Sequence, residues 1–522
     1  MTGPRGTRLA APTAGLLAVA VALATAELVA GILPGGQSPL AVVADRIIVL
    51  MPAVVVGLAL DLLGTANRPV LLLSMLGVSA AVGASIGRWA ARWRWAAPLG
   101  FLPFVLLGTA AGIADPLLPT ATAVTAPPVG ALAGLMVLWR FPGTAAAGGG
   151  DPSEPGEEVA LPDPTAPPGP TRRDVLVWAG PAAGAAVVFA VTGRTLQMRA
   201  AHGSLPDEFA LPAPADPLPP PPATTSLDVE GISPLLTSND DFFRIDTAFR
   251  VPRIDPDAHV VRITGLVDQP YSLSYDQLLE MADTEADVTL TCVSNEVGGG
   301  LIGNARWHGV PLERVLERAG VRAGATQVVG RAVDGWTAGF PLEVLDGRPA
   351  LIAVGMNGES LPVEHGFPVR LVIAGLYGYV SDTKWLAEIE LTTFDAYDAY
   401  WVRRGWAREG PIKTQSRIDV PRHGASLAAG PVAVAGVAWA GDRGIERVEV
   451  SVDDRAWEQA ELADELAPTT WRQWRLRWDA EPGEHTLRVR ATDGTGETQT
   501  DQVRPPAPDG ATGHHTIRIS VA

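Results

Sequence analysis

Cys292 is the only cysteine among the 522 residues, and it lies in the run LTCVSNEVGGG (290–300). A lone thiol has no internal disulfide partner, so it is either a small core residue or a group that does chemistry. The apolar residues Val288 and Leu290 predict a strand that ends at the thiol, and the glycines that follow let backbone approach a bound group. An exposed thiolate is a soft donor for a transition metal. We therefore interpret Cys292 as a candidate metal ligand.

Composition divides the chain into two parts. The first two hundred residues are dominated by Ala, Leu, Val and Gly, whereas the rest is globular in composition, with Arg, Asp, Glu and Trp throughout. A chain of this length holds more than one domain. The formal charge of −17, from 40 basic and 57 acidic residues, argues against nucleic acid as a partner, because phosphate binding needs a basic excess.

The apolar part reads as a membrane region. Arginines near the ends of the clear apolar spans decide its topology, because they lie on one side only if the short stretch 47–63, which contains Pro52 and Asp61, does not cross. These arginines are Arg5, Arg8, Arg88, Arg92, Arg94, Arg140, Arg172 and Arg173. We predict that this stretch is re-entrant or interfacial. The protein is then a multi-pass protein of the cell membrane with a cytoplasmic N-terminus and an extracytoplasmic C-terminal half. The predicted crossing helices are 9–33, 69–86, 95–113, 120–138 and 175–191.

Two features of this region allow two readings each. Glu27 is either a functional intramembrane carboxylate or a residue at the outer headgroups. Arg172 and Arg173 either belong to a twin-arginine export signal, which suits a domain that folds around a cofactor before export, or anchor the fifth helix. We predict four crossings within 1–140, a disordered cytoplasmic linker at 141–171, the fifth helix at 172–194 and a Pro-rich spacer at 195–225.

The globular part is predicted to contain two domains. Residues 226–410 mix strand-like and helix-like patterns, such as the strand 260–267 and the helix 274–282, without regular βαβ alternation, which is typical of an α+β domain. Residues 411–522 alternate apolar and polar side chains with period two between turn-forming runs. This pattern predicts an immunoglobulin-like β-sandwich.

The globular part resembles the sulfite oxidase family of molybdenum enzymes over roughly Asn239 to Ala522. The run TLTCVSN followed by ARWHGVPL resembles the molybdenum-binding segment of that family, MNGESLPVEHGFPVRLVIAG (356–375) its pterin-binding stretch, and TKWLAEIEL (383–391) the strand after it. The resemblance implies a molybdenum-molybdopterin cofactor with Cys292 as the thiolate ligand. It also implies that the β-sandwich mediates homodimer formation.

Further site residues follow from the resemblance, position by position. It implies that His365, Arg370 and Lys384 hold the pterin and its phosphate, which suits the need of a buried phosphate for charged donors. Cys292 and Arg244 are the implied catalytic residues. The full set of implied cofactor-binding residues is Asn239, Phe242, Phe243, Arg244, Cys292, Asp334, His365, Arg370, Thr383 and Lys384.

Two departures from the family pattern bear on the substrate. Val354 stands where sulfite oxidases have a tyrosine near the metal, and Arg244 is one residue out of register with the arginine that holds their substrate. Sulfite specificity is therefore open. Other residues of the chain are candidates for an anion site or for the pocket wall: Arg306, Arg331 and Lys413 for the first, and Trp336, Tyr377 and Tyr379 for the second.

The function implied is oxygen-atom transfer on a small sulfur oxyanion, with the cofactor doing the redox chemistry. A sulfoxide reductase of the same fold is one alternative, and a non-catalytic membrane-tethered binding module is another. The sequence has no CxxCH motif, and one cysteine does not hold an iron–sulfur cluster, so we expect no haem and no iron–sulfur cluster. Electrons are then exchanged with a separate partner, either a cytochrome or the quinone pool.

Overall fold

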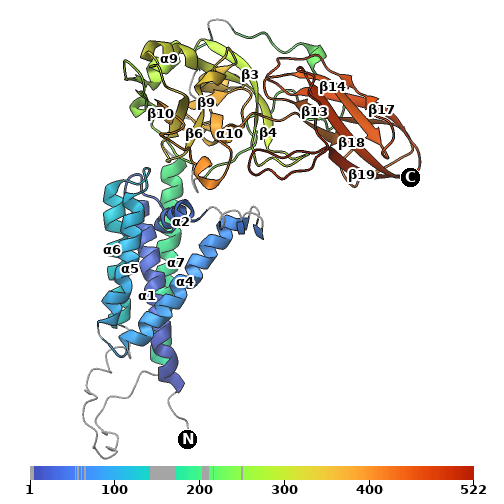
Figure 1. Ribbon diagram of the computed structural model, residues 1–522. Helices are drawn as coiled ribbons and strands as arrows, with labels where there is room; N and C mark the ends of the chain where they lie inside the picture. Colours follow the sequence, from blue (N-terminus) through green and yellow to red (C-terminus); the bar gives the residue numbers. More distant parts are fainter. Residues whose placement is uncertain are drawn as a thin grey trace, which may run out of the picture. The chain divides into compact units, whose positions relative to one another are not determined.

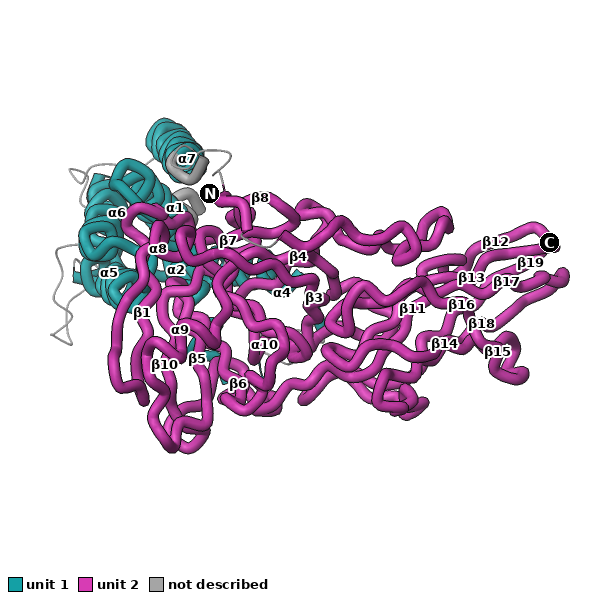
Figure 2. The backbone as a smooth tube through the Cα atoms, turned by 90° about the horizontal axis from the view of Figure 1, so that it is seen from above, with its two compact units in different colours: residues 1–205 teal, residues 206–522 magenta. Residues whose placement is uncertain are grey.

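The computed structural model describes residues 5–52, 66–93, 95–140, 172–202, 211–214, 217–247 and 251–522, with the isolated positions 55, 58, 59, 62 and 63. The chain forms two compact units, 1–205 and 206–522, shown in different colours in Figure 2. The predicted linker at 141–171 and part of the predicted spacer lie outside the described residues.

The first unit is helical, and four of its described helices are long and apolar enough to cross a membrane. They coincide with the first four predicted spans, which confirms those helices. The long helix α1 packs against α4, α6 and α7, and α5 packs against α6 (Figure 1). The helices of this unit are α1 (Arg5–Ile32), α2 (Pro39–Leu50), α4 (Asn67–Ala90), α5 (Ala96–Ile113), α6 (Thr120–Arg140) and α7 (Arg172–His202).

Close helix packing in this unit depends on small residues. A Cβ atom added to Gly15 of α1 would lie 1.9 Å from the Gly83 carbonyl oxygen of α4, and one on Gly193 of α7 would lie 2.5 Å from the Glu27 carbonyl oxygen of α1. Such contacts let backbones approach directly, which is how apolar helices associate where lipid removes the hydrophobic drive.

The remaining membrane predictions stay predictions. The predicted fifth span lies within α7, which continues to His202 rather than ending at residue 194, because good helix formers such as Leu196 and Met198 extend it. The side chains of Arg172 and Arg173 lie outside the described residues. Helix α2 has 12 residues, about 18 Å at 1.5 Å per residue, which is too short to cross. Beyond α2, positions 53, 54, 56, 57, 60 and 61 of the stretch 47–63 are not described.

Glu27 is bonded to two other helical segments. The Ser38 hydroxyl, which caps α2, donates to Glu27 Oε1 at 2.6 Å, and the Gln197 amide of α7 donates to Glu27 Oε2 at 3.0 Å. Gln197 also donates to the Glu27 main-chain oxygen at 3.1 Å. Each carboxylate oxygen thus has a donor, so the side chain has a role in joining α1, α2 and α7.

The second unit contains the predicted α+β arrangement. Apolar Leu312, Val315, Leu316 and Ala319 form the buried face of helix α9 (Leu312–Ala319). This part of the unit contains two sheets.

The first sheet has the order β2 (Tyr271–Ser274), β1 (Val260–Gly265), β10 (Leu386–Thr392), β5 (Gln327–Ala332), β6 (Thr337–Pro341). The second sheet has the order β3 (Thr284–Thr291), β4 (Ile302–Pro311), β7 (Ala350–Met356), β8 (Glu359–Ser360), and β9 (Arg370–Ile373) pairs with β7. The helices are α8 (Tyr275–Met281), α9 (Leu312–Ala319) and α10 (Gly378–Ser381).

The predicted β-sandwich is confirmed by two packed sheets (Figure 1). Its core includes Trp474, Val434, Val450 and Leu487, all fully buried. Residues 206–522 form one compact unit, so the boundary between residues 410 and 411 stays a prediction. The sheets have the orders β11 (Gln415–Val420), β13 (Gly430–Trp439), β17 (Arg472–Ala480), β16 (Glu461–Leu462) and β12 (Ser426–Leu427), β19 (His515–Val521), β18 (Gly483–Asp493), β14 (Ile445–Val452), β15 (Glu458–Gln459).

Candidate active site

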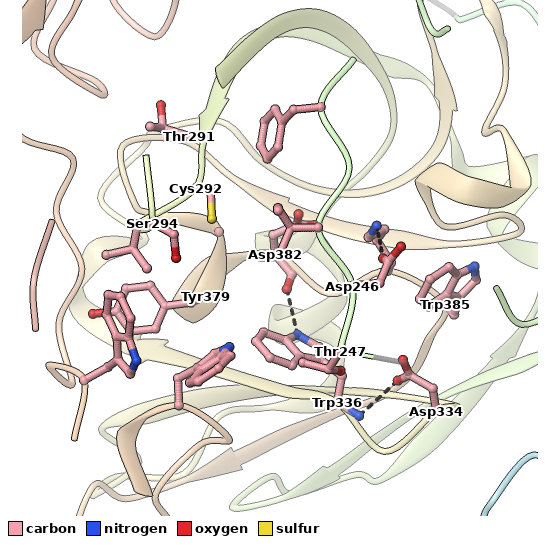
Figure 3. Close-up of a pocket in the computed structure, with 17 residues that line it drawn as sticks. Asp246, Thr247, Thr291, Cys292, Ser294, Asp334, Trp336, Tyr379, Asp382 and Trp385 are labelled. Carbon is pink, nitrogen blue, oxygen red and sulfur yellow. Dashed lines mark hydrogen bonds and ion pairs between the residues drawn. The ribbon is translucent and has the colours of Figure 1, made fainter. Parts of the chain in front are cut away.

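A cavity of about 140 Å³ opens where β3 ends, and Cys292 lies in its wall (Figure 3). Segments far apart in the sequence build it: the end of β3, the turn between β5 and β6, the segment around α10, and two stretches without regular structure. Its lining residues are Phe243, Ile245, Asp246, Thr247, Thr291, Cys292, Val293, Ser294, Asp334, Trp336, Gly378, Tyr379, Asp382, Lys384, Trp385, Trp401 and Trp406.

The loop after β3 fixes Cys292 through backbone bonds. The Cys292 amide donates to the Leu301 carbonyl at 2.9 Å, and the Asn295 amide donates to the Cys292 carbonyl at 3.0 Å. The Asn295 side chain closes the loop by accepting from the Leu301 amide at 2.8 Å. Burial raises the pKa of the Cys292 thiol, and Ser294 lowers it in part. The thiol is therefore protonated at neutral pH in the cofactor-free chain.

The residues predicted to bind the pterin lie together at this cavity. Arg370 is 3% exposed and donates to both carboxylate oxygens of Asp382, at 2.7 and 2.5 Å, and to the His365 carbonyl at 2.9 Å. His365 Nε2 donates to the Asn239 carbonyl at 2.9 Å. Lys384 lines the cavity and forms an ion pair with Asp246.

The two phenylalanines predicted near the cofactor lie at the cavity, whereas the arginine next to them does not line it. Phe243 lines the cavity, and Phe242 stacks on it with ring centroids 5.2 Å apart. Phe242 also meets the His365 ring edge-on at 5.6 Å. Arg244, in contrast, is 43% exposed and pairs with Asp246 at 2.6 Å, so its side chain does not line the cavity.

Unsatisfied polar atoms test whether a cofactor fits. Thr291 Oγ1, His365 Nδ1 and Thr383 Oγ1 are buried without a hydrogen-bond partner, and all three residues belong to the cavity wall or to the predicted pterin set. Buried polar groups are nearly always paired, so these three atoms fit a bound group that would pair with them. Among the described residues no group of three or more His, Cys, Asp or Glu is placed to hold a metal ion, so a metal at Cys292 needs other ligands, as a pterin dithiolene would supply.

Electrostatics keep the site close to neutral. Burial, followed by the Arg370 charge, lowers the pKa of His365 to about 4, so its imidazole is neutral at pH 7. Burial also lowers the pKa of Lys384, against the pull of Asp246. Although burial opposes them, the Lys384 and Arg244 cations lower the pKa of Asp246.

Asp334 gives a testable pH dependence. Burial raises its pKa from 3.8 to about 6, and its Oδ1 accepts from the Trp336 amide at 3.0 Å, a bond that an asparagine keeps. Because the folded chain binds this proton more tightly than the unfolded chain, the carboxylate costs stability as pH rises from 3.8 to about 6. We expect Asp334→Asn to stabilise the cofactor-free chain by about 1–3 kcal/mol near pH 7.5 and not near pH 3 in urea titrations.

A control separates burial from general charge removal. Exposed Asp240→Asn should change stability at neither pH. A gain of equal size at both pH values for Asp334→Asn would show that the carboxyl does not carry a raised pKa.

The structure also places the other candidates from the sequence. Trp336 and Tyr379 line the cavity, whereas Tyr377 is buried beside it. The three candidate anion-binding cations all have partners elsewhere and do not line the cavity: Arg306 pairs with Asp287, Arg331 with Glu390, and Lys413 with Asp509.

Sequence reasoning missed several residues. Asp246 and Asp382 are the carboxylate partners of the predicted cations, and the only signal in the sequence is that each lies within two residues of one of the named site residues. Trp401 and Trp406, whose ring centroids are 6.0 Å apart, also line the cavity. Together with Trp336 and Tyr379 they form its aromatic wall. The spacing of Tyr400, Trp401 and Trp406 in the sequence matches neither a helical nor a strand period.

The fold and the cavity define an oxidoreductase of the molybdopterin-binding class. The family model described as "Oxidoreductase molybdopterin binding domain" matches residues 248–401, and the one described as "Mo-co oxidoreductase dimerisation domain" matches residues 410–504. The second match supports a homodimer.

Curated relatives agree with this class. The mitochondrial sulfite oxidase of Rattus norvegicus is 33% identical over 305 residues, 49% of this chain and 56% of the relative. The sulfite oxidase of Gallus gallus is 31% identical, over 52% of this chain and 69% of the relative. The "Uncharacterized oxidoreductase YuiH" of Bacillus subtilis is 35% identical, over 29% and 73%. The match covers little more than half the length of the rat enzyme. The chain belongs to the sulfite oxidase family of molybdopterin oxidoreductases.

Proposed function

We propose that the protein is a membrane-anchored, extracytoplasmic molybdenum oxidoreductase that transfers an oxygen atom to or from a small sulfur compound. One observation carries this proposal: the only thiol of the chain faces a cavity of about 140 Å³ around which three buried polar atoms lack partners. The four long apolar helices support the anchor, and the arginine distribution supports the extracytoplasmic side.

The chain's own residues would hold and orient the cofactor. Cys292 would bind the metal, and Arg370 and Lys384 would neutralise the pterin phosphate. Neutral His365 and Thr383 offer free polar atoms to the pterin. When bound, the cofactor supplies two-electron oxygen-atom transfer. The cavity wall would orient the substrate and keep bulk water from it.

Two substrates fit this chemistry, and both reactions balance. Sulfite and water give sulfate, two protons and two electrons, whereas a sulfoxide, two protons and two electrons give a thioether and water. The relatives named sulfite oxidase support the first. The electrons would pass to or from a separate partner, a cytochrome or the quinone pool.

The charges of the cavity favour the sulfoxide. Asp246, Asp334 and Asp382 line it, and Lys384 is the one cation among its described lining residues. That cation already pairs with Asp246. Asp382 is likewise paired, with Arg370, so an anion such as sulfite would meet no unpaired cation among the described lining residues, whereas an uncharged sulfoxide needs none.

The aromatic wall favours the same choice. Tyr400 connects two of its rings, with its centroid 5.3 Å from that of Trp336 and 5.3 Å from that of Trp401. The centroids of Trp406 and Tyr379 are 5.8 Å apart. Ring faces recognise apolar substituents and polarisable sulfur. A sulfoxide with apolar substituents matches such a wall better than a small hydrated anion does.

Two dye assays on the purified full chain in detergent separate the substrates. We expect methionine sulfoxide to oxidise a reduced viologen dye and sulfite to reduce no acceptor dye. Activity with sulfite alone would overturn the preference for sulfoxide, and metal-loaded protein without either activity would overturn oxygen-atom transfer to or from sulfur.

A further inference from the structure

The outer edge of β3, the strand that ends at the thiol, is covered by the β-sandwich. Among the described strands β3 pairs with β4 alone, so one row of its backbone groups faces away from the sheet. The Thr289 amide in that row donates to the Thr469 carbonyl at 3.0 Å. The Thr469 hydroxyl donates to the Asp287 carbonyl at 2.6 Å. Thr469 lies just before β17, so a residue of the sandwich part completes the pairing of this edge.

Thr289 connects this contact to the inside of the sheet. Its hydroxyl accepts from the Trp471 amide at 2.8 Å and donates to the Asn304 side chain of β4 at 3.1 Å. Trp471 and Asn304 both donate to the Leu235 carbonyl at 2.8 Å. Thr289, Thr469 and Trp471 are 2%, 6% and 3% exposed. Bonds in such dry surroundings are costly to leave unmade.

The other side of the thiol loop is held by the sandwich as well. Arg417 of β11 donates to the Gly299 carbonyl at 2.8 Å. The ring of His515, on β19, lies so close to Gly298 that an added Cβ would be 2.2 Å from it. The segment that carries Cys292 is therefore bonded to the sandwich before and after the thiol.

We infer that the β-sandwich positions Cys292, in addition to any role in dimerisation, and that Thr469 is a positioning residue for the thiol. An edge strand without a partner frays, and Cys292 comes three residues after Thr289. The Thr469 contact pairs the outer edge of β3 at Asp287 and Thr289, close to the thiol. The orientation of a metal ligand depends on such supporting bonds.

The single cysteine gives a direct measurement. In the full chain, purified in detergent from a host that lacks the cofactor, the rate of iodoacetamide alkylation reports on Cys292 alone. Thr469→Val removes the hydroxyl at nearly constant volume. We expect alkylation to become about five-fold faster, the change in a local opening equilibrium that the loss of one average hydrogen bond produces. Thr469→Ser, which keeps the hydroxyl, should restore the original rate.

A matched control lies one residue away. Thr470 is 3% exposed, and its hydroxyl bonds the Ala467 carbonyl of its own turn at 2.8 Å, not β3. Thr470→Val should therefore leave the alkylation rate unchanged. Equal acceleration by Thr469→Val and Thr470→Val, or none by Thr469→Val, would overturn the inference. Because no substrate or cofactor takes part, this result is independent of the proposed function.

Discussion

Cys292→Ser is expected to leave a folded chain with less than about 1% of the wild-type molybdenum content and activity. Loss of an outer partner of a metal ligand costs 10–100-fold, so loss of the thiolate itself should exceed about 100-fold. A serine hydroxyl is a hard donor that keeps its proton at neutral pH, and it is a poor ligand for a soft site. Elemental analysis measures the molybdenum content, and the dye assays measure the activity.

The neighbouring Ser294→Ala is the matched control. Ser294 lines the same cavity but is not a proposed ligand, and its influence on the thiol is to lower the pKa in part. This variant should keep its molybdenum. Circular dichroism should show the same secondary structure for both variants. If Cys292→Ser keeps metal and activity, the thiol is a core residue and the metal is held elsewhere.

The elements of this chain were predictable wherever one local pattern sets the structure. Apolar runs of about 20 residues identified α1, α4, α5 and α6, because a helix needs about that many apolar residues to cross a bilayer. Period-two alternation identified β13, β14, β18 and β19 of the sandwich. Strand β17 was missed, although Trp474, Leu476 and Trp478 alternate with charged residues along it.

The site was predictable only in part, for a related reason. Cys292, His365, Arg370 and Lys384 lie in runs of sequence that resemble a family, so each was found from its neighbours. Their partners are set by the fold. Lys384 and Asp246 are 138 residues apart, and the chain holds 57 acidic residues, so no spacing identifies the one that pairs.

The substrate wall was hidden in the same way. Trp336 follows β5, whereas Trp401 and Trp406 lie near residue 400 in a stretch without a period. Only the folded chain brings them around one cavity. Likewise, no pattern in the sequence indicates that Thr469 would pair with β3. Long-range contacts of this kind decide the charge and shape of the cavity.

Arg370→Gln is expected to destabilise the cofactor-free chain by about 3–5 kcal/mol, because it leaves the Asp382 carboxylate buried without its partner. The Asp382 side chain is 14% exposed, and both of its oxygens accept from the guanidinium. The guanidinium also lies 4.9 Å from the centre of the Trp307 ring. Urea titration followed by tryptophan fluorescence measures the loss without any cofactor.

The double variant Arg370→Gln/Asp382→Asn distinguishes a lost pair from a stranded charge. It removes both charges, so it should recover more than half of the lost stability. The exposed pair of Arg262 and Glu388 provides the comparison, since Arg262 is 53% exposed and Arg262→Gln should cost less than about 1 kcal/mol. If the double variant is no more stable than Arg370→Gln, the loss comes from packing against Trp307 rather than from the buried carboxylate.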